Sequence, residues 1–137
     1  MVFIRALAEV DDRTGFSCGN PKLDRFFREY AWVNQSVYSI SKTYVAVEGA
    51  AIVGFVTVTP SEIACDDVPK PKRIRGTPKA YRLPVIRLAR LGVGRSRQKQ
   101  GIGTMLVRYV FQLAIQTETL LGCSGVLVDA KPESVPF

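Results

Sequence analysis

The chain has 137 residues, 47% hydrophobic and 23% charged, which is typical of one globular domain, residues 1–137. Its net charge is +7, from 19 basic and 12 acidic residues. It has no histidine, which excludes Ser-His-Asp and Cys-His nucleophiles, and its three cysteines form no CxxC pair, so we expect no metal. No apolar run approaches the roughly 18 residues of a membrane span, and the N-terminus does not have the pattern of a secretory signal. We therefore expect a cytoplasmic protein that does not bind a membrane.

The first third of the chain predicts a strand and then a helix. Residues 2–7 are predicted as the strand. Asn20 is a good N-cap, and Pro21 suits the first helical position because its missing N–H costs nothing there. One helical face then collects large apolar side chains, namely Leu23, Phe26, Phe27 and Tyr30. We therefore expect a helix from Pro21 to about Asn34.

The middle of the chain predicts three strands and a basic loop. Residues 43–49 are predicted as a strand and residues 51–59 as its partner. The segment 48–50, which contains a glycine, supplies the turn between them, so the pair is predicted to form a hairpin. A loop punctuated by three prolines follows over 66–82. Residues 84–93 predict a further strand.

A long amphipathic helix and a last strand complete the predicted elements. The helix opens at Gly101 and ends at Gly122, a good C-cap. Its apolar stripe is predicted to contain Ile102, Leu106, Tyr109, Val110, Leu113 and Leu120. Residues 125–130 predict the last strand, and 131–137 show no regular pattern. The order β-α-β-β-β-α-β predicts an α/β (α+β) fold, a mixed sheet with helices packed on it.

The positive charge is concentrated in one window of the sequence. Residues 68–100 contain no Asp or Glu, and their basic residues are Lys70, Lys72, Arg73, Arg75, Lys79, Arg82, Arg87, Arg90, Arg95, Arg97 and Lys99. Such a field attracts polyanions, either nucleic acid or a phosphorylated cofactor. A solvated, solubilising loop is the other interpretation, because charge runs are commonly just that.

The segment after the 84–93 strand predicts a phosphate site. Glycines 101 and 103 let the backbone approach a ligand closely. The first N–H groups of the following helix have no intrahelical partner and lie at its positive end, which suits a phosphate. The segment is neither a P-loop nor a dinucleotide fingerprint, since it lacks GxxxxGK[ST] and a third glycine. Glycines that serve only the turn would explain the GxG pair equally well.

A longer pattern, Gln98-x-x-Gly101-x-Gly103 directly after Leu91-Gly92-Val93, resembles the acetyl-CoA signature of the GNAT superfamily of N-acetyltransferases. Further blocks resemble the GNAT toxins of bacterial type II toxin–antitoxin modules: Phe16-x-Cys18-Gly19-Asn20-x-x-Leu23-Asp24-x-Phe26, Thr43-Tyr44-Val45, Arg90-Leu91-x-Val93 and Val128-Asp129-Ala130-Lys131. The resemblance covers nearly the whole chain in the right order. It implies a mostly antiparallel sheet flanked by helices.

The resemblance also implies a reaction and a set of binding residues. GNAT toxins transfer acetyl from acetyl-CoA to the α-amine of aminoacyl-tRNA and so block translation. The cofactor would be bound by Leu91, Gly92, Val93, Gln98, Lys99, Gln100, Gly101, Ile102, Gly103 and Thr104. The tRNA would contact Arg90 and the loop cations Lys70, Lys72, Arg73 and Arg75. For Arg90 a salt bridge or an exposed strand charge is an equal alternative.

The C-terminus departs from the family pattern. GNAT domains continue past this point with a helix that carries Phe-Tyr-x-x-x-Gly-Phe, whose tyrosine is the general acid, and with further strands. Phe137 resembles the phenylalanine just before that tyrosine, so the chain looks truncated and its catalytic acid is unassigned. The sequence does not assign that role to any of the five tyrosines present. A truncated gene or expressed fragment, an inactive homologue, and a domain completed by another chain all fit.

Partners and competing functions follow from the same features. The sheet edge left by the absent strands would invite pairing, so we expect a homodimer or another partner, and the family's partner is a ribbon-helix-helix antitoxin. An N-acetyltransferase of a small molecule or protein is one alternative function. A catalytically inactive GNAT-like module that binds nucleic acid or a partner through the basic face is the other.

Overall fold

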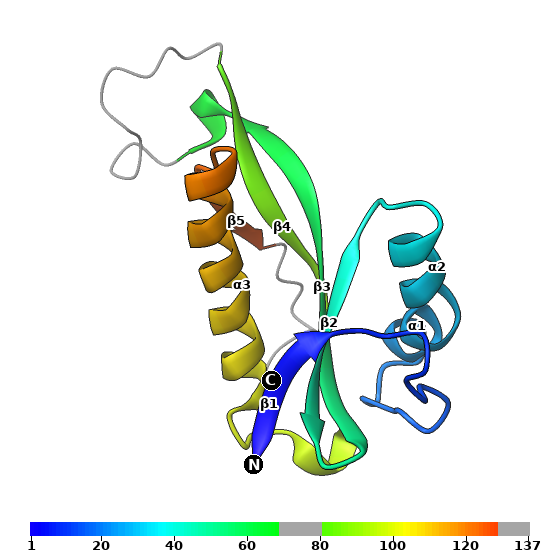
Figure 1. Cartoon of the computed structure of the whole chain (residues 1–137). Helices are drawn as coiled ribbons and strands as arrows, with labels where there is room; N and C mark the ends of the chain where they lie inside the picture. The colour runs from blue at the N-terminus through cyan, green and yellow to red at the C-terminus, as the bar shows by residue number, and fades with distance from the viewer. Residues whose placement is uncertain (69–80, 129–137) are drawn as a thin grey trace.

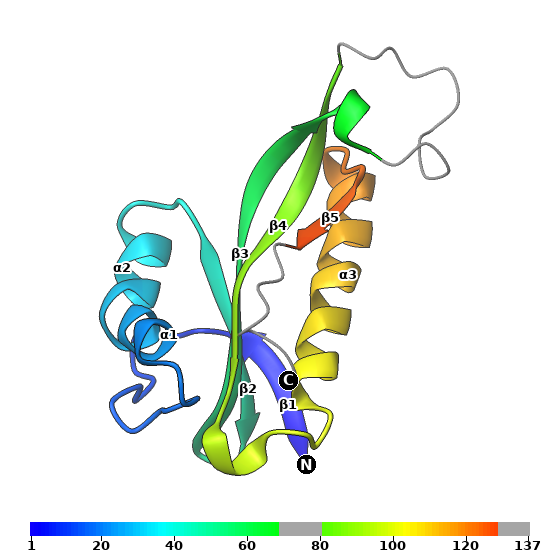
Figure 2. The same ribbon diagram turned by 180° about the vertical axis from the view of Figure 1, so that it is seen from behind.

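The computed structural model describes residues 1–68 and 81–128, which form one five-stranded sheet (Figures 1 and 2). The strands follow one another across the sheet in chain order: β1 (Val2–Ala6), β2 (Lys42–Glu48), β3 (Ala51–Ala64), β4 (Arg82–Val93) and β5 (Gly125–Val128). The first four are antiparallel, and β5 is parallel to β4. The expected mixed, mostly antiparallel sheet is confirmed. The last two residues of the predicted 125–130 strand lie outside the described residues.

The predicted first helix is present in three consecutive pieces: α1 (Pro21–Arg25), a π-helical turn (Phe26–Tyr30) and α2 (Ala31–Ser36). Its start is as expected, because the Asn20 side-chain oxygen accepts hydrogen bonds from the backbone N–H groups of Lys22 and Leu23. The π turn is a local widening that the apolar spacing does not reveal.

The second helix, α3 (Ile102–Leu120), covers the face of the sheet opposite α1 and α2 (Figure 1). It ends where expected, with Gly122 at φ +109° and its N–H donating to Thr117 O. The predicted apolar stripe is wrong at its end. Leu120 is 80% exposed, so the described residues leave most of its side chain uncovered.

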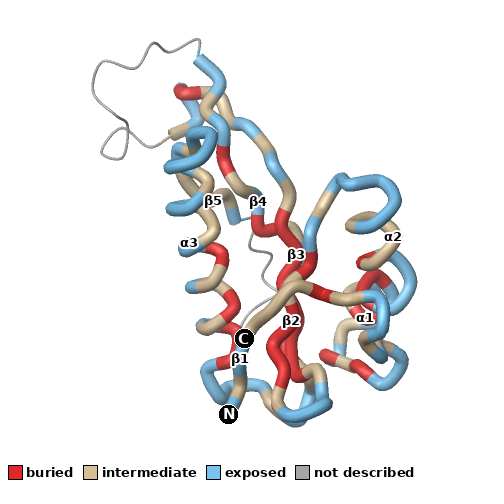
Figure 3. Tube along the Cα trace, in the orientation of Figure 1, coloured by how far each residue is buried: buried red, intermediate tan, exposed pale blue. Residues whose placement is uncertain are grey.

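The core divides into two clusters, one on each face of the sheet. Figure 3 shows that the buried residues are concentrated in the central strands and in parts of the helices that cover them. The α1/α2 face is aromatic and buries Phe16, Phe26, Phe27 and Phe55 beside alternate residues of β2. The α3 face is aliphatic and buries Val53, Val56, Val58, Leu88, Val93, Ile102, Leu106 and Val110. Neighbouring residues of one strand alternate between the clusters, as a sheet packed on both faces requires.

The strands β3 and β4, which pair with each other, are both longer than the sequence predicts. β3 reaches Ala64 rather than residue 59, and β4 starts at Arg82 rather than 84. Pro60 is tolerated in β3 because β2 ends opposite Val58, so the strand has an open edge there. A bulge at Ala89 shifts the β3–β4 register, so the faces of β4 exchange between its two halves.

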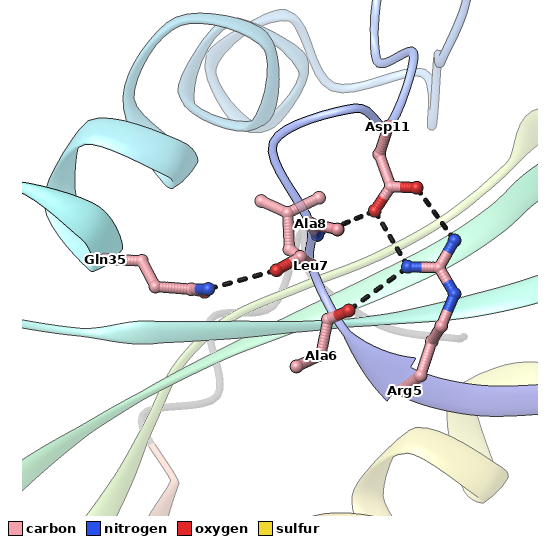
Figure 4. A network of polar contacts seen from close by, with 6 residues as sticks. All are labelled: Arg5, Ala6, Leu7, Ala8, Asp11 and Gln35. Atoms are coloured by element: carbon pink, nitrogen blue, oxygen red, sulfur yellow. Dashed lines mark hydrogen bonds and ion pairs between the residues drawn. The ribbon is translucent and has the colours of Figure 1, made fainter.

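A polar network at the end of β1 positions the loop that leads to α1 (Figure 4). The Arg5 guanidinium donates to both oxygens of Asp11 (2.8 and 2.7 Å) and to Ala6 O (3.1 Å). Gln35 donates to Leu7 O (3.0 Å) and accepts from Thr43 N–H (2.9 Å). The Gln35 amide thus continues the β1–β2 ladder where β1 leaves the sheet and ties α2 to it.

Candidate acetyl-donor site

The predicted site begins at the end of β4, where the strand has one free edge. β5 pairs with β4 only along Val85–Leu88, so no described strand flanks residues 91–93 on that side. The Gly94 N–H donates to Val53 O in β3 (2.8 Å). Because backbone groups alternate in direction along a strand, the N–H and C=O groups of Leu91 and Val93 point away from β3. The sequence prediction that these two residues offer backbone groups is therefore compatible with the register.

Gly92 has a packing role that the sequence does not reveal. A Cβ built at Gly92 would lie 2.7 Å from Cε1 of Phe55 and 3.4 Å from Cys18 Sγ. The fully buried Phe55 ring, on the neighbouring strand, therefore occupies the space of the missing side chain. This glycine is required by the aromatic core on the α1/α2 face, whether or not its backbone also contacts a ligand.

The turn that joins β4 to α3 depends on left-handed backbone. Arg95–Arg97 form one 3₁₀ turn, after which Lys99 and Gly101 have φ values of +62° and +86°. Gly101 is the N-cap of α3 and has no side-chain cap, and a Cβ built on it would meet nothing within 4 Å. The space in front of the first turn of α3 is therefore open.

The first turn of α3 presents free backbone donors to that space. The Met105 N–H bonds to Gly101 O, so the intrahelical ladder starts there. The N–H groups of Ile102, Gly103 and Thr104 precede it and have no intrahelical acceptor. Ile102 and Gly103 are buried and fix the helix against the sheet, whereas Thr104 is exposed. This is the geometry that suits an anion at a helix N-terminus.

Of the three cations in the turn between β4 and α3, one binds an acidic residue of the chain and two are exposed. Arg97 forms an ion pair with Glu48 at the end of β2 (2.8 Å) and donates to Gln100 Oε1 (2.8 Å). Its guanidinium lowers the pKa of the Glu48 carboxyl, chiefly through this hydrogen bond. Arg95 and Lys99 are exposed and make no ion pair with a described residue. They are the cations available to a ligand at this end of α3.

The chain matches a known protein family over most of its length. The family model of the acetyltransferase (GNAT) family matches residues 6–133. The chain is a member of the GNAT acetyltransferase family. Over 126 residues it is 34% identical to the tRNA-acetylating toxin of Mycobacterium tuberculosis (strain ATCC 25618 / H37Rv), which is 92% of this chain and 74% of that relative.

Solved structures agree with the family assignment. AtaT complexed with acetyl-methionyl-tRNAfMet has a TM-score of 0.85 and 26% identity, over 97% of this chain and 80% of that one. AtaTR bound with acetyl-CoA has a TM-score of 0.76 and 26% identity, over the same shares. The resemblance to GNAT toxins is thus confirmed, and the mixed sheet of this GNAT chain is the fold of those structures.

Arg90 lies beside the GNAT strand end on the α1/α2 face. Its guanidinium stacks over the Phe26 ring, 4.0 Å from the centroid, and no described residue forms an ion pair with it. Partial desolvation, with the nearby Arg87 charge, lowers its pKa. The salt-bridge interpretation of Arg90 is therefore not what the described residues show. The other predicted tRNA contacts, Lys70, Lys72, Arg73 and Arg75, lie outside the described residues.

Among the described residues of this GNAT domain, burial keeps the reactive groups of Cys18 and Tyr44 in their protonated forms. Burial raises the pKa of the Cys18 thiol to about 11, so it remains protonated at neutral pH and is a poor nucleophile. Tyr44 and Tyr109 pack together with ring centroids 4.9 Å apart, and burial raises the pKa of Tyr44. Among residues 1–68 and 81–128, no three Cys, Asp or Glu gather as metal ligands, and no helix is long and apolar enough to span a membrane.

Proposed function

We propose that this chain is an acetyl-CoA-dependent N-acetyltransferase of toxin type, which acetylates the α-amine of aminoacyl-tRNA. The observation that carries the proposal is the open first turn of α3, with its free N–H groups at residues 102–104 and Gly101 in left-handed backbone. The similarity to a tRNA-acetylating toxin and to AtaT with its acetylated tRNA supports the substrate. The similarity to AtaTR bound with acetyl-CoA supports the donor.

The residues present fit acetyl-CoA. The N–H groups of Ile102, Gly103 and Thr104 would bind the pyrophosphate, with Lys99, Gln100 and Arg95 beside them. The outward N–H and C=O groups of Leu91 and the outward N–H group of Val93 would hydrogen-bond the acetyl and pantetheine arm, as they would hydrogen-bond another strand, whereas Val93 O accepts from Gln98 Nε2. Gly92 would keep this strand end close to the α1/α2 face.

Direct transfer suits a chain without histidine. The unperturbed pKa of an α-amine is about 7.7–8.0, so a useful fraction is neutral at pH 7 without a strong base. The neutral amine attacks the thioester carbonyl, so an N–C bond forms and the C–S bond breaks. The nitrogen then loses the proton that makes it cationic, and the coenzyme A thiolate gains one, which leaves a neutral amide and a thiol. The protein's work is to orient the two substrates and to polarise the carbonyl with a backbone N–H. The protonated Cys18 thiol takes no part.

We further propose that Arg90 contacts the 3′ end of the tRNA. It is exposed on β4, one residue before Leu91, and the Phe26 ring holds its guanidinium without neutralising it. Lys70, Lys72, Arg73 and Arg75, which lie outside the described residues, would add further contacts to the phosphates of the acceptor stem. The partners that complete this proposal are a ribbon-helix-helix antitoxin and a second copy of the chain, in the cytoplasm.

Calorimetric titration with acetyl-CoA tests the donor site. We expect saturable binding by the wild-type chain and loss of binding in Gly101→Leu, because a side chain there would enter the open space that the pyrophosphate needs. Gly122→Leu is the matched control, since Gly122 also has a positive φ and open space, at the other end of α3. Unchanged affinity of Gly101→Leu would place the donor elsewhere.

Substrate competition then tests the acceptor. Acetylation of charged tRNA but not of polyamines or peptides is expected, and Arg90→Ala should weaken it without weakening acetyl-CoA binding. Preference for small amines would favour the ordinary N-acetyltransferase. A folded chain that ignores acetyl-CoA yet binds RNA with steep salt dependence would favour the binding module.

A further inference from the structure

Gln98 is the first residue of the acetyl-CoA signature, and although the residue is exposed, its side-chain amide hydrogen-bonds other parts of the protein. Its Nε2 donates to Cys18 O (2.9 Å) and to Val93 O (3.2 Å). The two N–H groups of one amide thus meet two carbonyl oxygens, one in the loop before α1 and one at the end of β4. We infer that Gln98 is a positioning residue, which fixes the β4–α3 turn by tying it to the Cys18 carbonyl. This inference rests on the proposed acetyl-CoA site.

The segment around Cys18 is held against the same turn at other points. The Arg95 N–H donates to Ser17 O (2.9 Å). A Cβ built on Gly19 would lie 3.5 Å from Arg95 Nε, and one built on Gly94 would lie 3.9 Å from the Phe16 ring. The loop before α1 therefore contacts the β4–α3 turn at several points between Gly94 and Gln98. The Gln98 side chain makes the contact that lies furthest along the turn.

Asp24 fixes the loop from its other side. This α1 carboxylate is only 6% exposed. Its Oδ1 accepts from the Cys18 N–H (2.8 Å) and its Oδ2 from Ser17 Oγ (3.2 Å). The N–H of Cys18 is thus held by Asp24 and its C=O by Gln98. This chain of contacts links the Cys-Gly-Asn-x-x-Leu-Asp block to the Gln-x-x-Gly-x-Gly block.

The chemistry of the two acceptors makes the inference specific. Both partners of Gln98 are carbonyl oxygens, so the side chain must be a donor. In Gln98→Arg the guanidinium can donate to both carbonyls. In Gln98→Glu a carboxylate of nearly the same shape would face two oxygens and be repelled. In Gln98→Ala both carbonyls would lose their partner, and the turn its anchor.

The test is a series of acetyl-CoA titrations on the full chain, with thermal melting to check folding. Gln98→Ala should raise the Kd for acetyl-CoA about tenfold, as expected for losing one or two hydrogen bonds. Gln98→Glu should bind more weakly still, and Gln98→Arg should recover most of the affinity. Gln112→Ala, which removes an exposed glutamine from α3, is the matched control and should bind like wild type. On charged tRNA, KM for acetyl-CoA should rise in Gln98→Ala while kcat at saturation stays close to wild type.

The outcomes separate this inference from the proposed function. If wild type does not bind acetyl-CoA, the proposed donor site fails and the inference fails with it. If wild type binds and Gln98→Ala or Gln98→Glu binds equally well, only the positioning role is overturned. If Gln98→Ala does not fold, the order of affinities of the Arg and Glu variants decides, and equal affinity would contradict the inference.

Discussion

The two faces of the sheet are packed with different side chains. On the α1/α2 face, Phe27 stacks on Phe55 with ring centroids 4.5 Å apart, and Phe16 meets both rings edge-on at 5.0 and 5.6 Å. On the α3 face the buried cluster is aliphatic. The buried polar side chains of the described residues, Asp24, Thr43 and Thr57, all belong to the α1/α2 side.

The aromatic and the aliphatic cluster support different parts of the structure. The aromatic face holds an irregular loop, residues 7–20, and a glycine of β4, and both need large rings and specific polar anchors. The aliphatic face holds one long regular helix, whose function here is to bring its own first turn to the end of β4. Stacked rings and hydrogen bonds therefore specify the first face, whereas close aliphatic packing, for example of Ile102 and Leu106 against Gly54, specifies the second.

The largest expected effect is the loss of Phe55. Phe55→Ala removes a fully buried ring that contacts three other phenylalanines and covers Gly92, and should lower the free energy of unfolding by about 3–5 kcal/mol. Leu106→Ala, which truncates a fully buried side chain of the aliphatic face, should cost about 2–4 kcal/mol. Urea denaturation measures both. A larger loss in Leu106→Ala would contradict the view that the aromatic face is the more specifically packed.

A methyl group at Gly92 tests the same face by overpacking. Gly92→Ala would place Cβ 2.7 Å from Phe55 Cε1, so the ring or the strand must shift, at a cost of about 1–3 kcal/mol. The matched control is Gly125→Ala in β5, where nothing lies within 4 Å and stability should change by less than about 0.5 kcal/mol. Equal stability of the two variants in thermal or urea unfolding would show that Phe55 does not need the glycine.

Local patterns were enough to predict most of this fold. Asn20-Pro21 marked the first helix, Gly49 the hairpin and Gly122 the end of α3, because each signal depends on neighbouring residues only. The open N-terminus of α3 was predictable for the same reason, since Gly101 and the next residues form it alone.

The rest depends on contacts between distant parts of the chain. Arg97, which the sequence places in the basic window, reaches Glu48, and Gln98, which the resemblance places at the cofactor, reaches Cys18, so both side chains bind other parts of the chain. Phe55 explains Gly92 only through the β3–β4 register. Leu120 fitted the helical period but has no described neighbour to cover it. A periodic pattern in the sequence predicts which side chains lie on the same face of a helix or strand. The residues that these side chains contact depend on the tertiary fold.

The hydrogen bond between Thr43 and Thr57 on the aromatic face gives a prediction with a smaller expected effect on stability. The side chains of Thr43 and Thr57 are fully buried and hydrogen-bond each other, with Oγ1 atoms 2.7 Å apart. Thr57→Val should cost about 1–2 kcal/mol, because the Thr43 hydroxyl then stays buried without this partner. The double variant Thr43→Val/Thr57→Val should recover most of that loss, since it removes both polar groups at similar volume. Additive losses in urea denaturation would show that the pair is not an isolated hydrogen bond.

The smallest effect concerns the Arg5–Asp11 pair, which anchors the start of the 7–20 loop. The hydrogen bond from Arg5 is the main cause that lowers the pKa of the Asp11 carboxyl below its usual value of 3.8. A carboxyl whose pKa is lower in the folded chain adds stability above its unfolded pKa, and that stability is lost as the pH falls through the folded pKa. Asp11→Asn should therefore be less stable than wild type near pH 6, and the difference should shrink toward pH 3. Glu9→Gln, at an exposed carboxylate of the same loop, is the control and should show a smaller difference. A difference for Asp11→Asn that does not change with pH would mean that packing, rather than the ion pair, holds the loop on the aromatic face.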